Sequence, residues 1–446
     1  MPEIQSTVAP PYAPQSQAWK RLSDDGGIWE HRGKVALVGR GHTDIERRWD
    51  GKDFSKSLGS LSVLAALRCM EDAGVSPDQI DGVMSSPGAQ SGGITIGSHW
   101  FPRPYFAPPY DSEDGLSRVT AEWLIKGLER DGTPLKNVKY ICSTADTLFE
   151  SIAQAAQAVG DGLCNTLLVL YPTGNLEGRY HLNPALEARG EAQWGNPWGW
   201  GMPVAYPFAE YCRKYGTSHD RMAPFIVNSR RNGLMFPWTY YSLHESTPLT
   251  VEDYLATRWV CKPLSLMDCD RPVHAAACYL VTTAERARDA KQKPVYVLSH
   301  SEDGPHTPRS TLETLEETEA WTDRMARKVW RGSGLSPKDI DVFNPYDGFA
   351  LFTQYFLEAL QWHGVKRGEA HDFYAGDISV EGSHPFLSSG GNIGNGRTRT
   401  AVVTDCMEQL QGRAGKRQVN VRCETAMFVG VLPARNSAVV FSNSLD

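Results

Sequence analysis

Apolar and polar positions along the chain form short blocks that predict strands alternating with helices. Residues 34–39 and 438–441 read as buried strands, and residues 167–171 form a continuous apolar run, typical of a strand with both faces buried in a parallel sheet. Helical spacing of apolar or small side chains is found at residues 148–159 and at Phe349, Phe352, Phe356 and Leu360. Strands that alternate with helices indicate an α/β protein built in layers.

A short pattern occurs twice in the chain and points to an internal repeat. Residues 74–83 read GVSPDQIDGV, and residues 334–343 read GLSPKDIDVF. Each copy follows an amphipathic helical stretch that a glycine ends, and each leads into a short strand. Chance similarity over one patch is the alternative, but the matching flanks favour a duplication.

Composition narrows the class of protein. The chain has 446 residues, 41% of them hydrophobic and 22% charged, which suits several globular domains and argues against disorder. The net charge of −7 excludes a nucleic-acid binder that relies on bulk positive charge. The sequence shows neither a membrane-spanning apolar run nor a secretory signal, so we expect a cytoplasmic protein without membrane partners. The 9 cysteines contain no CxxC pair, so neither a disulfide framework nor a metal site is expected.

The segment between the two copies has a different character. Residues 194–201 read WGNPWGWG, a loop that presents large apolar faces. Such a loop is either a lid over the substrate or a surface packed on a partner subunit, and the sequence does not separate the two. The 13 tryptophans of the chain suit a large apolar pocket or interface.

Several further segments are specific enough to compare with known families. They lie at residues 215–217, 228–232, 249–253, 263–264, 268–269, 275–277, 282–287, 344–349, 389–396 and 409–415. From about Lys34 to Phe441 the chain resembles the thiolase superfamily, in particular the branch of sterol carrier protein-type thiolases and thiolase-like steroid side-chain aldolases (lipid-transfer proteins). The resemblance implies an α/β thiolase-like fold, with two duplicated βαβαβαββ halves in a five-layer arrangement and an inserted loop domain.

The repeat and this resemblance together predict the domain boundaries. Residues 1–30 are proline-rich and are expected to form an extended N-terminal arm. Residues 31–173 are expected to form the N-terminal half, which residues 271–300 complete. Residues 174–270 are the predicted loop domain or lid, and residues 301–446 the C-terminal half.

The nucleophile of family thiolases is missing at its expected position. Those enzymes carry a cysteine at the N-terminus of a buried helix, where its pKa is lowered. The family spacing to Gly162 places Ala145 there, whereas using Cys142 would rotate the helix by about 300° and turn its buried face outward. Thr147 and Glu150 have the spacing of a capping box, which suits the start of a helix. We therefore predict that Cys142 is a buried structural thiol, and its use as a nucleophile is the alternative.

Other family groups are replaced as well. Tyr346 stands where thiolases have one histidine, Arg397 stands where they have another, and His274 lies in a changed Asp-Gly-Ala motif. The steroid aldolases also lack the cysteine and carry a tyrosine at the position of Tyr346. A second tyrosine of those enzymes corresponds to Arg397 here, which leaves the substrate and the mechanism open.

The resemblance implies retro-aldol cleavage of a β-hydroxyacyl-CoA, which needs a base, donors for the enolate oxygen, and an acid. Tyr346 is predicted to be the base or a proton shuttle. Because a free tyrosine has a pKa of about 10, a base role requires a cation beside it, such as Arg397, which can instead orient the substrate. Asp347 is expected to order the loop or simply to support a turn. The expected enolate donors are Asn344 and backbone N–H groups of the glycine loop (Gly390, Gly391, Gly394 and Gly396).

A CoA thioester is the expected substrate, with no tightly bound cofactor. Arg230 and Arg231 are expected near its phosphates, and structural ion pairs are the alternative. His274 can reach the site, although a lone histidine is more often structural. The resemblance further implies a homodimer and a small partner with an OB-fold and a zinc ribbon, so that any zinc belongs to the partner.

These observations predict an enzyme, a carbon–carbon lyase acting on acyl-CoA. The expected reaction splits a bulky β-hydroxyacyl-CoA, with a steroid or similar polycyclic side chain, into a ketone and acetyl- or propionyl-CoA. The alternatives are an acyltransferase or thiolase that uses Cys142, and a non-catalytic acyl-CoA-binding subunit of a complex. The sequence does not identify the polycyclic skeleton.

Overall fold

The computed structural model of the chain describes residues 18–23, 25–50, 52–86, 115, 119–143, 147–175, 201–304, 314–432 and 435–445. Within these ranges a nine-stranded mixed sheet has the strand order β3-β2-β4-β7-β1-β8-β11-β10-β9. Its strands are β1 (Val35–His42), β2 (Gly82–Ser85), β3 (Tyr140–Ser143), β4 (Thr166–Thr173), β7 (Ala275–Thr283), β8 (Val295–Asp303), β9 (Val342–Pro345), β10 (Thr425–Leu432) and β11 (Arg435–Ser442). A separate two-stranded sheet consists of β5 (Trp259–Cys261) and β6 (Leu264–Ser265).

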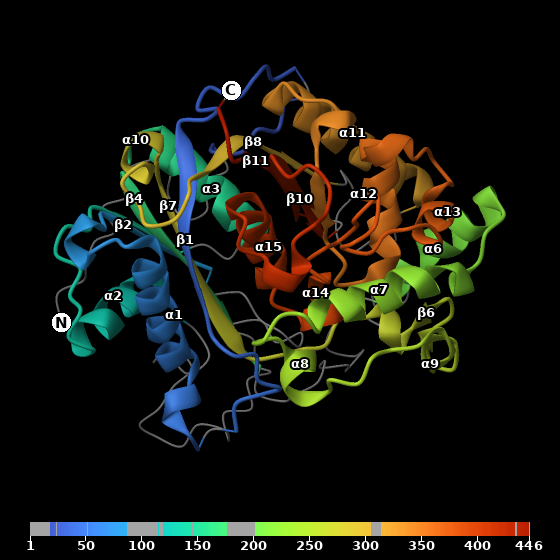
Figure 1. The fold of residues 1–446 in the computed structure, drawn as a ribbon, viewed down its shortest axis with the longest axis horizontal. Coiled ribbons are helices and arrows are strands. Elements are labelled where there is room, and N and C mark those ends of the chain that lie inside the picture. The colour runs from blue at the N-terminus through green and yellow to red at the C-terminus, as the bar shows by residue number, and fades with distance from the viewer. Residues whose placement is uncertain are drawn as a thin grey trace, which may run out of the picture.

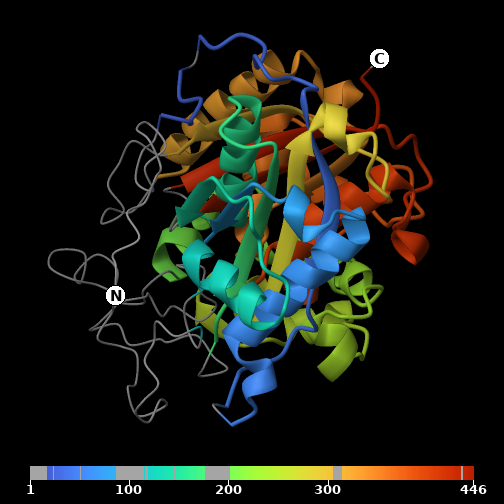
Figure 2. The same cartoon turned by 90° about the vertical axis from the view of Figure 1, so that its left-hand side faces the viewer.

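Helices pack on the sheet in layers (Figure 1). They are α1 (Leu58–Ala73), α2 (Ala121–Arg130), α3 (Leu148–Gly160), α6 (Gly201–Tyr215), α7 (Ala223–Gly233), α8 (Tyr240–His244), α9 (Val251–Leu255), α10 (Ala284–Ala287), α11 (Leu315–Ser333), α12 (Thr353–Leu360), α13 (Ala370–Tyr374), α14 (Gly391–Asn395) and α15 (Thr400–Gln411). Helices α3 and α15 share one core with strands from both ends of the sheet. Helices α1 and α2 lie side by side over the β2 and β4 end (Figure 2), and α11 and α12 pack near the β9 end.

The repeated pattern forms the same succession of elements at both places. Helix α1 ends at Gly74 with φ 68°, and α11 ends at Gly334 with φ 71°. This left-handed conformation favours glycine, which has no Cβ to clash. Each glycine leads through a short 3₁₀ turn into a strand that pairs in parallel, β2 or β9. The local repeat is therefore confirmed, whereas duplication of whole halves, the number of layers and the domain boundaries stay predictions.

Two elements differ in detail from the sequence-based expectation. Strand β4 is buried throughout, as predicted, but it is parallel only to β2 and antiparallel to β7. The aromatic stripe that starts at Phe349 was expected to be one helix. Instead, Phe349 is extended and pairs with Cys269, so α12 begins only at Thr353 after a 3₁₀ turn. This strand-like pairing holds the segment before α12 against the residues that precede β7.

Two expectations concern segments that the structure covers only in part. The tryptophan-rich loop at residues 194–200 lies outside the described residues, as does most of the predicted arm. Where the arm is described, the indole N–H of Trp29 donates to Gln157 of α3 at 2.8 Å, and the backbone N–H of Arg21 donates to Glu302 of β8 at 2.7 Å. Among the described helices, none combines the length and apolarity needed to cross a lipid bilayer.

Candidate functional site

Tyr346 follows β9 and is held in one position by its neighbours. Its backbone N–H donates to the carbonyl of Val429 in β10 at 2.8 Å, and its side chain is 1% exposed. A Cβ on Gly348 would overlap the Tyr346 hydroxyl, and a Cβ on Gly430 would lie 2.8 Å from the Tyr346 Cβ. The two glycines therefore leave the room that this tyrosine occupies.

A buried carboxylate, Asp270, lies beside the Tyr346 hydroxyl. Asp270 Oδ2 and the hydroxyl both lie within 2.7 Å of the position that a Cβ on Gly348 would take. The Asp270 backbone N–H donates to the Gly348 carbonyl at 2.9 Å, and Asn392 donates to Asp270 Oδ2 at 3.2 Å. Burial raises the pKa of Asp270 to about 6, although Arg397 and Arg399 oppose the shift. Asp270 is therefore mainly ionised at neutral pH.

Two arginines supply positive charge to this place. Arg397, the predicted cation, has its Nε 3.9 Å from Asp270 Oδ2. Arg399 was not predicted, yet its guanidinium carbon lies 5.4 Å from the centre of the Tyr346 ring. Arg399 also donates to the hydroxyl of Tyr171 in β4 at 2.7 Å. We call Tyr171, Asp270, Tyr346, Arg397 and Arg399 the Tyr346 site.

The charge state of Tyr346 distinguishes the two predicted roles. Burial raises the pKa of Tyr346 to about 12, although Arg399 and Arg397 favour the phenolate. The predicted cationic neighbours are thus present, but burial outweighs them. At neutral pH the phenol keeps its proton, which favours a proton shuttle over a free-standing base.

Asp347 faces the glycine loop. Its two carboxylate oxygens accept the backbone N–H groups of Asn392, at 2.6 Å, and Ile393, at 3.0 Å, at the start of α14. A Cβ on Gly391 would overlap this carboxylate. Burial raises the pKa of Asp347 to about 8, against the effect of the two N–H donors. These contacts tie Asp347 to the glycine loop, and its role in the reaction stays a prediction.

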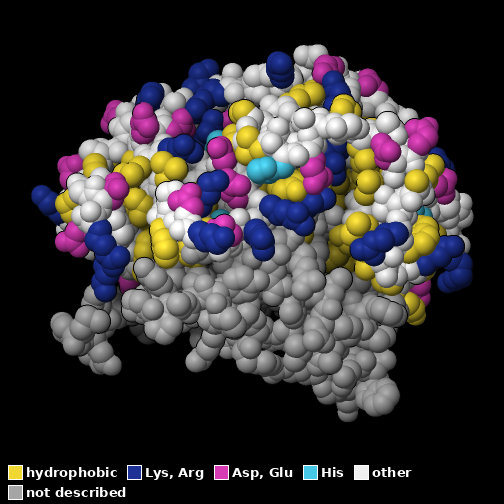
Figure 3. All heavy atoms as spheres, turned by 90° about the horizontal axis from the view of Figure 1, so that it is seen from below, with side chains coloured by type: hydrophobic (Ala, Val, Ile, Leu, Met, Phe, Trp, Pro, Cys, Tyr) yellow, Lys and Arg dark blue, Asp and Glu magenta, His cyan; other side chains and the backbone are white. Residues whose placement is uncertain are grey.

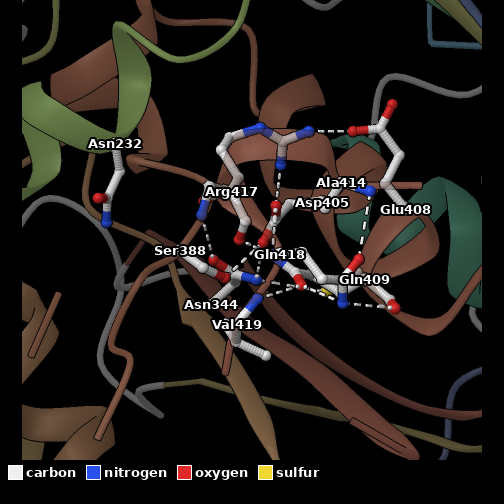
Figure 4. Close-up of polar contacts among 12 residues, drawn as sticks. Asn232, Asn344, Ser388, Asp405, Glu408, Gln409, Ala414, Arg417, Gln418 and Val419 are labelled. Carbon is white, nitrogen blue, oxygen red and sulfur yellow. Dashed lines mark hydrogen bonds and ion pairs between the residues drawn. The ribbon is translucent and has the colours of Figure 1, made fainter. Parts of the chain in front are cut away.

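Asn344 is engaged in a second buried network, which we call the Arg417 cluster (Figure 4). Its members are Asn344, Ser388, Asp405, Glu408 and Arg417. The Asn344 amide donates to Asp405 at 3.1 Å, and its oxygen accepts the Ser389 N–H at 3.1 Å. Asp405 pairs with Arg417, which also pairs with Glu408. Both ends of the Asn344 amide are therefore occupied within the protein, and donation to an enolate stays a prediction.

The glycine loop is closely packed against its neighbours in the structure. The sequence predicts an active-site loop that needs close backbone approach, and its contact with substrate stays a prediction. In the structure a Cβ on Gly394 would overlap the Ser229 carbonyl, and a Cβ on Gly233 would overlap the Gly394 carbonyl. Gly390 and Gly396 have φ values of 72° and 99°. Gly390 and Gly394 therefore need to be glycine because they pack on the backbone of α7.

Replacing Gly394 by alanine is expected to lower the free energy of unfolding by about 1–3 kcal/mol, the usual cost of overpacking. The added methyl group has to displace backbone of α7 or α14. Urea unfolding measures the loss, and Gly27→Ala is the control because a Cβ there meets no atom within 4 Å. Equal midpoints for the two variants would contradict the close packing.

The predicted CoA-binding arginines occupy different environments. Arg231 forms two hydrogen bonds with Glu381, at 2.6 and 2.8 Å, which is the predicted alternative of an ion pair. Arg230 lies 3.3 Å from the centre of the Tyr241 ring and lines a hollow of about 570 Å³ beside α8 and α9. Lys and Arg side chains gather near the middle of the underside of the molecule (Figure 3). Arg231 is therefore paired with Glu381, whereas Arg230 shares its hollow with Glu245 and Asp253, and the CoA contact itself stays a prediction.

His274 is held by backbone groups on both sides of its ring. Its Nδ1 accepts the N–H of Asn175 at 3.2 Å, and its Nε2 lies 3.0 Å from the carbonyl of Lys56. Burial lowers its pKa to about 4. The neutral ring thus joins two segments of the N-terminal part, which matches the structural alternative stated for a lone histidine.

Cys142 lies in strand β3 rather than at the start of a helix. The thiol is buried, and the Gln154 amide lies 3.5 Å from its sulfur. Helix α3 begins at Leu148, and the N–H of its N-cap Thr147 donates to Glu150 at 3.3 Å. The predicted helix start and the buried thiol are therefore confirmed. Ala145 lies outside the described residues.

Three of the residues in the Tyr346 site were missed by sequence reasoning. Asp270 directly follows the predicted segment 268–269, Arg399 lies two positions after the predicted Arg397, and Tyr171 ends an apolar run predicted only as a strand. Asn392, inside the glycine loop, links the site because it contacts Asp270, Asp347 and Arg399. The repeated arginine in GRTRT is the one signal that could have indicated Arg399.

Comparison with known proteins gives consistent matches. Residues 306–443 match the family model described as thiolase C-terminal domain-like. A 17-hydroxy-3-oxo-4-pregnene-20-carboxyl-CoA lyase of Mycobacterium tuberculosis is 27% identical over 383 residues, covering 81% of this chain and 87% of the relative. A steroid side-chain-cleaving aldolase of Thermomonospora curvata is 25% identical over 382 residues, covering 81% and 86%. The solved structure of an Ltp2-ChsH2(DUF35) aldolase superposes with a TM-score of 0.72 at 20% identity, covering 92% of this chain and 98% of that one.

Proposed function

Because this chain is a member of the thiolase superfamily, we propose that it is a thiolase-like aldolase. It splits a bulky β-hydroxyacyl-CoA, with a steroid or similar polycyclic side chain, into a ketone and acetyl- or propionyl-CoA. The observation that carries this proposal is the placement of the Tyr346 hydroxyl beside Asp270, with Arg399 next to the ring. The fold similarity and the names of the two lyase relatives agree with it.

The proposed reaction begins with removal of a proton from the substrate. The β-hydroxyl proton passes to the Tyr346 oxygen while the phenol proton passes on to Asp270, which is ionised above a pKa of about 6. The bond between the α- and β-carbons then breaks. Its electron pair forms the enolate of the shorter acyl-CoA, and the β-carbon becomes the ketone. Arg397 adds positive charge beside Asp270 and the developing enolate.

This chemistry forms no covalent bond between substrate and protein. A buried Cys142 in β3 is therefore compatible with it. The alternative is an acyltransferase or thiolase that uses Cys142, and a silent acyl-CoA-binding subunit is a third possibility. Replacing Cys142 by serine separates them, because the aldolase should keep its cleavage rate within about twofold, whereas an acyltransferase should lose turnover.

The assembly is proposed by analogy with the solved Ltp2-ChsH2(DUF35) aldolase, whose name gives two components. We propose a homodimer that also binds a small OB-fold and zinc-ribbon protein, with any zinc in that partner. The chain itself takes the CoA thioester as substrate and needs no tightly bound cofactor. The full fold proposed for it has two duplicated halves in five layers with an inserted loop domain.

The proposed function is tested by product analysis. The full chain is incubated with β-hydroxyacyl-CoA thioesters that carry straight-chain, monocyclic and steroid side chains, and the products are separated by mass spectrometry. Formation of a ketone and acetyl- or propionyl-CoA in equal amounts from the polycyclic substrates supports the proposal. Thiolytic products, or binding without turnover, contradict it.

The rate of cleavage is expected to fall below pH 6. Asp270 has a raised pKa of about 6 and must be ionised to accept the proton, so kcat/KM should decrease about tenfold for each pH unit below that value. A pH–rate profile measures this limb. In Asp270→Asn the rate should be lower throughout and the limb near pH 6 absent. A limb unchanged by the substitution would assign it to another group.

A further inference from the structure

Tyr171 is a second tyrosine in the candidate site, and it lies on a strand far from the one that Tyr346 follows. Tyr171 lies in β4, is 1% exposed, and belongs to the same core cluster as Tyr346. The two tyrosines come from β4 and from the residue after β9, which lie near opposite ends of the strand order. Arg399 contacts both, because its Nη1 donates to Tyr171 at 2.7 Å and its guanidinium carbon lies 5.4 Å from the Tyr346 ring centre.

The position of Arg399 between the two tyrosines is fixed by its backbone conformation and its contacts. Its backbone has φ 63°, a conformation uncommon for a residue with a side chain, and its N–H donates to the Asn392 side chain at 2.8 Å. Its Nε is buried and has no hydrogen-bond partner among the described residues. Burial lowers the pKa of Arg399, but the neighbouring Tyr171 and Tyr346 outweigh this effect and raise it. A fixed, buried cation with an unused donor suits a site where negative charge develops.

We propose that Tyr171 is the acid that protonates the α-carbon of the enolate, and that Arg399 positions it. This proposal rests on the proposed aldolase function and adds a catalytic residue to it. Arg399 occupies an acceptor site of the Tyr171 oxygen, so the phenol proton of Tyr171 is free to point elsewhere. Tyr346, which has Asp270 beside its hydroxyl, takes the proton of the β-hydroxyl group. Tyr171 gives its proton to the α-carbon.

The proton count closes without another reactant. The β-hydroxyl proton replaces the phenol proton of Tyr346, and that phenol proton ends on Asp270. The electron pair of the broken carbon–carbon bond forms a new C–H bond with the Tyr171 proton, which leaves a Tyr171 phenolate beside the Arg399 cation. Return of the Asp270 proton to Tyr171 through solvent restores the starting state. The overall change is one β-hydroxyacyl-CoA to one ketone and one acyl-CoA.

The reverse of the last step gives a test that does not require the natural substrate. Acetyl-CoA and propionyl-CoA are incubated with the full chain in D₂O, and deuterium at the α-carbon is followed by mass spectrometry. We expect wild type to exchange these protons and Tyr171→Phe to exchange them at least about 100-fold more slowly. The control is Tyr374→Phe, which removes another buried hydroxyl, bonded to Thr353 at 2.8 Å, outside the Tyr346 site. It should exchange at the wild-type rate.

A second variant tests the proposal in case the Tyr171→Phe protein does not fold. Replacing Tyr171 by 3,5-difluorotyrosine keeps the ring and hydroxyl but makes the phenol more acidic. The pH profile of exchange should then move to lower pH, which a merely structural role would not produce. A folded Tyr171→Phe protein that exchanges at the wild-type rate, or an unmoved profile, overturns the proposal.

Failure of this inference can be told apart from failure of the proposed function. If wild type cleaves a β-hydroxyacyl-CoA but its exchange is absent or independent of Tyr171, the acid is another group and only the inference falls. If wild type cleaves no β-hydroxyacyl-CoA in the substrate series, the aldolase proposal fails and the role of Tyr171 falls with it.

Discussion

Replacing Tyr346 by phenylalanine is expected to lower kcat for cleavage by about 10²–10⁴, the usual contribution of a positioned acid–base group. The substitution removes one oxygen and leaves the ring between Gly348 and Gly430 in place. Without the hydroxyl, the proton of the substrate has no path to Asp270. The fall should appear in kcat more than in KM, because the lost interaction matters most during bond breaking.

Steady-state kinetics and circular dichroism together check this expectation. Tyr374→Phe serves again as the matched control, since it removes a buried, hydrogen-bonded hydroxyl elsewhere in the core and should leave kcat unchanged. Its free energy of unfolding should drop by about 1 kcal/mol, the typical worth of one hydrogen bond. A folded Tyr346→Phe enzyme that cleaves at the wild-type rate would exclude the phenol from the proton path.

Replacing Asp405 by alanine is expected to lower the free energy of unfolding by about 3–5 kcal/mol, because it removes one of the two carboxylates that pair with the buried Arg417 and leaves the Ser388 and Asn344 donors without their acceptor. Asp405 is fully buried. Its carboxylate pairs with Arg417 and accepts hydrogen bonds from the side chains of Ser388 and Asn344. Burial raises the pKa of Asp405, and Arg417 opposes this shift. The substitution should also loosen Asn344 and with it the segment that leads to Tyr346.

Urea unfolding measures this loss, and an exposed pair of the same chemistry provides the control. Glu381 binds Arg231 with two hydrogen bonds, but their side chains are 51% and 45% exposed. Glu381→Ala should therefore cost less than about 1 kcal/mol. If the two substitutions cost the same, the Arg417 cluster contributes no more than a surface ion pair.

The parts of the fold that the sequence predicted are those set by local patterns. Runs of apolar residues identified β1, β4 and β11. A strand buried on both faces is apolar at successive positions, so the sequence alone indicates it. Glycine after an amphipathic stretch identified the ends of α1 and α11, since both glycines adopt positive φ. The late start of α12 depends on pairing between Phe349 and Cys269, which no local pattern encodes.

Only those residues of the candidate site that lie in recognisable sequence motifs were predicted. Tyr346 and Arg397 stand in loops whose sequences resemble a known family. Asp270, Arg399 and Tyr171 meet Tyr346 through the folding of distant segments, so their spacing in the chain gives no signal. The glycine loop shows the same limit, because a run of glycines indicates close approach but does not say which backbone approaches. Its neighbour is α7.

The central claim is that this fold breaks a carbon–carbon bond by moving protons, without an acylated sulfur. The most direct measurement is rapid-quench mass spectrometry of the intact protein during a single turnover of a β-hydroxyacyl-CoA. The account predicts that ketone and shorter acyl-CoA appear while the protein mass stays unchanged. An acyl adduct that forms and decays at the rate of turnover, mapped to Cys142, would contradict it.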